Sequence, residues 1–349
     1  MSTENSLSEN KDDYALVIGI DDYPMIEGAS LQNARKDAES VYKWLTKQGG
    51  VPLENAHLLQ SAANGEDSTP QKQQIDRAYK QIFDSAEAKG QARRLYVYFA
   101  GHGVSQEVSH VALLTAGVSL SYMNASLDAE AYQKGLTLKA LFDEQVIFYD
   151  CCRNYDWHIR GVGPDWTTAD ATDRSVHLKQ RVLFAAGFTQ SANARPVHNT
   201  KRGIFTEALL EGLNGGACRK RENGEWEISF RTLTDYLAVR VKQIAKDEGY
   251  GSQEVHESTD GEAGDLILLQ SPKPELIRMT AEVSTLQGSV IVRDRYFQEL
   301  SRKPLQNGKA EFEFPAGEYV VQIEPPTDLI NPSQIATLGE FAAQTIVFT

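Results

Sequence analysis

Short hydrophobic runs recur along the first three quarters of the chain, and segments with helical character separate them. The runs are typical of buried strands, and they lie at residues 14–20, 55–60, 94–100, 146–149, 181–186 and 265–269. Helical spacing, or a helix-start signal, predicts helices at residues 31–47, 69–88, 137–143, 204–213 and 233–246. This alternation predicts an α/β fold with a mostly parallel sheet and helices on both of its faces.

The pattern changes after residue 270. Ser271-Pro272-Lys273-Pro274 has the composition of a linker. Beyond it only short strand-like runs follow, at residues 289–293, 310–314, 319–323 and 344–348. Gln306-Asn307-Gly308 is a turn signal between two of them. We therefore predict a disordered polar tail at 1–13, a first domain at 14–270, a linker at 271–275 and a small all-β sandwich at 276–349.

Two of the buried strands end in residues that carry chemistry. The run 146–149 is followed by Asp150-Cys151-Cys152-Arg153-Asn154, and the run 94–100 by Gly101-His102-Gly103. Functional groups of open α/β sheets gather just past the carboxyl ends of the strands. A thiol near pH 7 is mostly protonated, and a neighbouring imidazole activates it as a nucleophile. The backbone N–H groups of Gly103 and Cys152 are suited to bind the oxyanion that such an attack forms.

Composition narrows the classes of function. The chain has 349 residues, 35 basic against 48 acidic, and a formal charge of −13, which argues against a sequence-independent grip on nucleic acid. It has three cysteines, which is too few for a disulfide framework, so we expect free thiols, a reducing compartment and a cytoplasmic location. It has no apolar run long enough to predict a membrane span.

The motifs at the strand ends resemble the caspase/metacaspase superfamily of cysteine peptidases. Gly101-His102-Gly103 and Asp150-Cys151-Cys152-Arg153-Asn154 carry the resemblance, together with the opening residues 15–20 and the segments 186–192 and 204–209. The resemblance covers residues 14–270 and implies a caspase-like three-layer sandwich and endopeptidase activity. By this resemblance His102 matches the general base, Cys152 the nucleophile, and Gly103 with Cys152 the oxyanion hole. Cys151 then points to the opposite face of the strand, because alternate residues do so.

The resemblance also indicates a substrate. Metacaspases that cut after Arg or Lys line the first pocket with carboxylates, and Asp37 and Asp150 match those positions. We therefore predict cleavage of protein or peptide substrates after Arg or Lys. Two alternatives stay open: a pocket built on Arg35 and Arg153 that accepts an acidic residue, and a catalytically inactive caspase-like scaffold.

The polar stretch 154–180 is long for a loop and occupies the place where caspase relatives are cut during maturation. Basic residues that would serve as self-cleavage sites are Arg160, Arg174, Lys179 and Arg181. Asp165, Asp170 and Asp173 in the same stretch are candidate calcium ligands, although scattered aspartates are usually only solvated. We otherwise expect no metal and no cofactor. The C-terminal β domain shows no catalytic cluster and is a candidate site for a regulatory partner.

Overall fold

A computed structural model describes residues 10–62, 69–90, 92–105, 110–119, 125–155, 160–166, 177–187, 202–221, 223–250, 253–270, 272, 274, 276–283, 288–294, 297–315, 317–324, 333–338 and 344–348. The chain divides into two compact units. The first comprises residues 1–210 and 244–266, and the second residues 211–243 and 267–349. The predicted tail at 1–13 lies mostly outside the described residues, and β1 (Asp13–Gly19) begins at its end.

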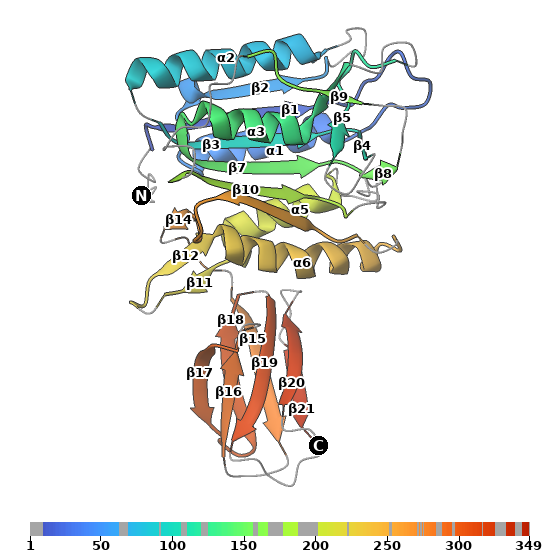
Figure 1. Ribbon diagram of the computed structural model, residues 1–349. Helices are drawn as coiled ribbons and strands as arrows, with labels where there is room; N and C mark the ends of the chain where they lie inside the picture. The colour runs from blue at the N-terminus through green and yellow to red at the C-terminus, as the bar shows by residue number, and fades with distance from the viewer. Residues whose placement is uncertain are drawn as a thin grey trace, which may run out of the picture. The chain divides into compact units, whose positions relative to one another are not determined.

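The first unit is built on a six-stranded sheet in the order β13-β10-β7-β3-β1-β2, whose strands can be followed in Figure 1. The bounds of its other strands are β2 (Ala56–Gln60), β3 (Ala92–Ala100), β7 (Phe142–Asp150), β10 (Lys179–Phe184) and β13 (His256–Gly261). All neighbouring pairs run parallel except β10 with β13. The predicted mostly parallel α/β sheet is confirmed.

Helices cover both faces of this sheet because successive strand residues point to opposite sides. Leu95, Val97 and Phe99 of β3 join one core cluster with residues from α2 (Lys72–Lys89) and α3 (Ala129–Lys139). The alternate residue Tyr98 instead meets α5 (Ile204–Glu211) on the other face. α1 (Ala34–Lys47) packs against β1 with a buried stripe at Ala34, Ala38, Val41, Trp44 and Leu45. The result is the predicted three-layer sandwich.

A smaller five-stranded sheet continues from the ends of the central strands. It has the order β8-β4-β5-β6-β9. Its strands are β4 (Gly103–Ser105), β5 (Val111–Leu113), β6 (Ser126–Asp128), β8 (Asn154–Tyr155) and β9 (Gly161–Val162). The apolar residues near 108–115 indicate a hairpin strand, which corresponds to β5. The other strands of this sheet have two or three residues and leave little periodicity in the sequence.

The second unit contains α6 (Phe230–Asp247) up to Gln243, the π-helical turn η3 (Gly212–Gly216) and three sheets. One sheet has the order β11-β12-β14, with β11 (Arg219–Lys220), β12 (Trp226–Ser229) and β14 (Ile267–Gln270). The other two are β18-β15-β21 and β17-β16-β19-β20, in which every pair is antiparallel except β15 with β21. The predicted small all-β region near the C-terminus is thus confirmed as part of the fold, whereas its exact boundary at 276 stays a prediction.

The strands of these two sheets are β15 (Ile277–Val283), β16 (Ser289–Arg293), β17 (Glu299–Pro304), β18 (Lys309–Phe314), β19 (Gly317–Glu324), β20 (Ser333–Leu338) and β21 (Gln344–Phe348). The turn predicted at Gln306-Asn307-Gly308 is present, with positive φ at Asn307 (54°) and Gly308 (76°). Positive φ at both positions is what a tight hairpin connection requires.

Two predicted elements are wrong. The helix expected at 137–143 lies earlier, at α3, and Phe142 already begins β7. The strand expected at 265–269 to close the main sheet belongs instead to the β11-β12-β14 sheet, and β13 takes the edge position. No helix within the described ranges combines the length and the apolar character that crossing a membrane requires.

Candidate active site

Two backbone ladders bring the His102 loop and the Cys152 loop to the same place. Ala100 pairs with Asp150 at the end of β3 and β7, and Val104 pairs with Asn154 between β4 and β8. His102 lies midway between the first members of these pairs, and Cys152 midway between the second. Because both ladders keep the same offset along the chain, the backbones of the two loops run next to each other. His102 and Cys152 accordingly line one pocket.

The loop between β1 and α1 fixes the imidazole of His102. His102 Nε2 lies 2.7 Å from the carbonyl oxygen of Ala29. A carbonyl only accepts hydrogen bonds, so Nε2 carries the proton and Nδ1 keeps its lone pair. Burial lowers the pKa of His102, an effect that the Ala29 contact opposes. A lowered pKa favours the neutral ring that a general base requires.

Tyr23 of the same loop holds His102 from a second side. The backbone N–H of His102 donates to the hydroxyl of Tyr23 at 2.8 Å, and the two rings lie 4.8 Å apart. Tyr23 is 1% exposed. Its contribution was not evident from the sequence, where Tyr23 only marks the break after the first strand.

The two adjacent cysteines have different surroundings. Cys151 is 1% exposed and belongs to the core cluster, and burial raises its pKa well above the usual value of a thiol. Cys152 is partly exposed, and neither cysteine forms a disulfide. A Cβ at Gly103 would lie 2.6 Å from both Cys151 Sγ and the carbonyl oxygen of Cys152. Gly103 therefore packs so closely against the cysteine pair that any side chain there would displace it.

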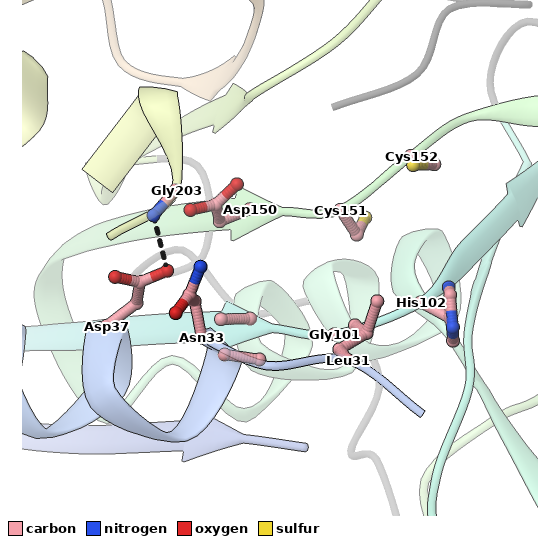
Figure 2. A pocket seen from close by; sticks show the side chains of 11 residues that line it. Leu31, Asn33, Asp37, Gly101, His102, Asp150, Cys151, Cys152 and Gly203 are labelled. Atoms are coloured by element: carbon pink, nitrogen blue, oxygen red, sulfur yellow. Dashed lines mark hydrogen bonds between the residues drawn. The ribbon is translucent and has the colours of Figure 1, made fainter. Parts of the chain in front are cut away.

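The pocket that contains His102 and Cys152 ends in two carboxylates. Figure 2 shows Asp37 and Asp150 facing each other beside Gly203, with His102 and Cys152 toward the other end. Asp37 is 3% exposed; its Oδ2 accepts the backbone N–H of Gly203 at 2.9 Å. Its Oδ1 is buried and has no hydrogen-bond partner among the described residues. An orphaned carboxylate oxygen of this kind is a place where a cationic group would be stabilised.

Burial perturbs both carboxylates of this acidic pocket. Desolvation, and next the charge of Asp150, raise the pKa of Asp37 to about 8. Desolvation also raises the pKa of Asp150 to about 6, opposed by hydrogen bonds from Thr206 and Tyr98. These shifts mean that ionising both groups is costly while the pocket holds no cation, and that a bound cation would repay that cost.

The five residues predicted for the site come together in the structure, four of them in the lining of this pocket and Gly103 against the cysteines. Gly203, Tyr98 and Thr206 were missed, because the sequence gives no signal that the start of a distant helix reaches the end of β7. Neither Arg35 nor Arg153 lines this pocket. The guanidinium of Arg153 instead lies over the ring of Phe184, 4.8 Å from its centroid.

One described segment of the 154–180 stretch is tied to α2 at Asp165. Asp165 forms an ion pair with Lys72 at 2.6 Å, and Lys72 also pairs with Asp76 at 2.6 Å. Asp170 and Asp173 lie outside the described residues, and no group of three metal-ligating side chains occurs among those that are described. With Lys72 on its carboxylate, Asp165 is poorly placed as a calcium ligand, and a calcium site stays an untested expectation.

Comparison with known sequences identifies the family. Residues 12–258 match the Caspase domain family, so the chain belongs to that family. A probable protease of a Desulfuromonadales bacterium is 29% identical over an alignment of 251 positions, which covers 65% of this chain and 29% of that protein. The match thus spans less than a third of the relative's own length.

Two solved structures match most of this chain. One is a protein of Geobacter sulfurreducens, with 15% identity, a TM-score of 0.47 and coverage of 72% of this chain and 95% of that chain. The other is Caspase-1 from Spodoptera frugiperda, with 14% identity, a TM-score of 0.48 and coverage of 76% and 94%.

Proposed function

We propose that this protein is a cysteine endopeptidase in which Cys152 and His102 form the catalytic dyad. The observation that carries the proposal is that His102 and Cys152 line one pocket, on two loops whose flanking strands pair with the same offset. Membership of the Caspase domain family supports it. The lowered pKa of His102 supports it further, because a neutral ring can take up the thiol proton near pH 7.

In the proposed reaction the thiol proton of Cys152 moves to Nδ1 of His102, and the thiolate attacks the scissile carbonyl carbon. The oxyanion that forms is bound by the N–H groups of Gly103 and Cys152. Collapse of the tetrahedral intermediate breaks the C–N bond, and His102 returns the proton to the leaving amine. Water then attacks the thioester with His102 as base, which releases the acid and restores the thiol.

The proposed specificity is for Arg or Lys at the residue before the cut. Asp37 and Asp150 close the pocket beside the proposed dyad, and Asp37 Oδ1 has no hydrogen-bond partner within the described part of the chain. The forked donors of a guanidinium, or the ammonium of lysine, would satisfy these oxygens. An acidic side chain would instead meet two carboxylates, which would repel it. Arg153, which an acidic substrate residue would need as its partner, lies over the ring of Phe184. Both observations favour basic over acidic specificity.

Cleavage of fluorogenic peptides tests this proposal. We expect wild-type protein to cut peptides ending in Arg or Lys before the reporter and to leave the Asp-ending peptide intact. Cys152→Ala should lose the activity by at least about a thousandfold, because the nucleophile is absent, whereas Cys218→Ala should retain it. Equal rates for wild type and Cys152→Ala would leave only the scaffold alternative, and cleavage of the Asp-ending peptide alone would reverse the specificity.

Self-processing in the 154–180 stretch belongs to the same proposal. Arg160 is exposed, whereas Arg181 is 6% exposed within β10 and donates to backbone carbonyl oxygens of Asp260, Glu262 and Gly264. Lys179 also lies in β10, and Arg174 lies outside the described residues. Of the described candidates, Arg160 is therefore the best placed to be cut. Intact mass spectrometry should find a fragment ending at Arg160 in wild type and none in Cys152→Ala.

A further inference from the structure

The start of α5 forms the floor of the acidic pocket. The Gly203 backbone N–H, just before the helix, donates to Asp37. One turn later the hydroxyl of Thr206 donates to Asp150 Oδ2 at 2.6 Å, and the backbone N–H of Thr206 also bonds that carboxyl group. The two carboxylates come from α1 and from the end of β7, so one helix turn is the element that both of them share. The positive end of a helix stabilises negative charge placed on it.

The buried hydroxyl groups of Tyr98 and Thr206 form a hydrogen bond that supports the contact between Thr206 and Asp150. Tyr98 Oη lies 2.5 Å from Thr206 Oγ1 and 3.3 Å from Asp150 Oδ2. Tyr98 and Thr206 are both 0% exposed. Because the Thr206 hydroxyl has one proton, which it gives to Asp150, its oxygen accepts the proton of Tyr98. Thr206 is thus fixed in the rotamer that points its donor at Asp150.

The backbone of Gly203 limits the space between the two carboxylates. A Cβ on Gly203 would lie 3.0 Å from Asp37 Oδ2 and 3.4 Å from Asp150 Oδ2. The volume between the carboxylates therefore ends at the Gly203 backbone. A cationic side chain that entered the pocket would meet the carboxylates from the side opposite α5.

We propose that Thr206 is a specificity-determining positioning residue, which holds Asp150 ionised and turned so that its carboxylate accepts a basic substrate side chain. This inference rests on the proposed endopeptidase function and deepens it. Thr206 touches neither the thiol nor the imidazole, so its effect is confined to recognition of the basic side chain. Without its hydroxyl, Asp150 loses a charge-assisted hydrogen bond and binds a proton more readily.

The test compares Thr206→Val, which has nearly the same shape and no hydroxyl, with wild type and with Thr206→Ser. For an Arg-ending peptide we expect kcat/KM of Thr206→Val to fall roughly 10- to 100-fold, mostly through KM, and Thr206→Ser to restore much of it. The acidic limb of the kcat/KM profile should move to higher pH in Thr206→Val, since Asp150 must be ionised to bind a cation. Thr46→Val is the matched control, because the Thr46 hydroxyl bonds only backbone carbonyls of its own helix.

Two alkylating probes separate recognition from damage to the fold. Iodoacetamide, which does not fill the pocket, should modify Cys152 at the same rate in Thr206→Val and wild type. An arginyl chloromethyl ketone should react more slowly with the variant. Equal slowing by both probes, or an unchanged KM and pH profile, would overturn the role of Thr206. Failure of wild type to prefer Arg or Lys would instead overturn the proposed specificity itself, so the two failures are distinguishable.

Discussion

At the scale of single residues, the imidazole of His102 depends on contacts from residues that do no chemistry themselves. Ala29 fixes which nitrogen carries the proton, and Tyr23 receives the backbone N–H of His102. Both belong to the loop after β1, far from His102 in sequence. The position of this loop therefore decides whether Nδ1 of His102 is available to the thiol.

We predict that Tyr23→Phe lowers kcat by roughly tenfold and leaves KM nearly unchanged. The Phe ring would keep the tilted contact with the His102 ring, but the partly buried backbone N–H of His102 would lose its acceptor, which costs about 1–3 kcal/mol. The measurement is steady-state cleavage of an Arg-ending peptide. Tyr42→Phe, a change of the same kind on α1, is the control. A kcat equal to that of wild type would show that Ala29 alone positions the ring.

At the scale of elements, the hydrophobic pattern predicted the strands of the main sheet except β13, its exposed edge strand. β13 reads His-Glu-Ser-Thr-Asp-Gly and is exposed at every position, so nothing in its composition distinguishes it from a loop. β14 carries an apolar run that any buried strand would show, and periodicity cannot decide which sheet receives it. The helix at 137–143 was misplaced because α3 begins at an N-cap, Asp128, rather than at the apolar run.

The same contrast holds for the site. Cys152, His102 and the two aspartates stand at strand ends or in motifs that a sequence displays. Thr206 and Tyr98 act through three-dimensional contacts between α5, β3 and β7, and a threonine inside an amphipathic helix gives no such signal. Residues that support a site from a neighbouring layer of the fold can therefore be identified only from the three-dimensional structure.

Trp166 is the anchor of the segment that follows Cys152. Its ring lies 4.8 Å from Tyr79, 5.1 Å from Phe83 and 5.2 Å from Tyr132, all on α2 or α3. Aromatic pairs of this kind contribute about 0.5–1.5 kcal/mol each beyond the area they bury. Together with the Lys72–Asp165 ion pair, these contacts hold residues 160–166 against the first unit.

We predict that Trp166→Ala increases the rate at which trypsin cuts after Arg160 by roughly tenfold, since local opening controls access to an anchored segment. Limited proteolysis of the Cys152→Ala background, followed by mass spectrometry, measures this rate without self-cleavage. Trp226→Ala, which removes a partly buried indole from β12, is the control. The anchor role is refuted if both variants are cut at the wild-type rate.

At the scale of the whole molecule, the two carboxylates of the acidic pocket affect the stability of the fold. The folded-state pKa values of Asp37 and Asp150, about 8 and about 6, lie above their ordinary value of 3.8. Between pH 3.8 and about 8 the folded protein therefore binds more protons at these two carboxyl groups than the unfolded chain does. The contribution of these two groups to the free energy of unfolding is greatest below pH 3.8 and declines as the pH rises through 6 and 8. The proposed basic specificity therefore requires two buried charges that lower the stability of the folded protein above about pH 6.

We predict that Asp37→Asn is more stable than wild type at pH 8, by an amount on the order of a few kcal/mol, and equally stable near pH 4. The amide keeps an oxygen for the Gly203 N–H and turns a donor toward Asp150, so the repulsion that ionised Asp37 exerts disappears. Urea unfolding at pH 4, 6 and 8 measures the difference, with Asp84→Asn as an exposed carboxylate control whose ion pair to Lys80 should contribute little. The same variant should lose cleavage after Arg, because a neutral amide cannot balance a guanidinium. A wild type that is more stable than Asp37→Asn at pH 8 would mean that ionising the two carboxylates does not destabilise the folded protein, and the proposed basic specificity would carry no stability cost at this pocket.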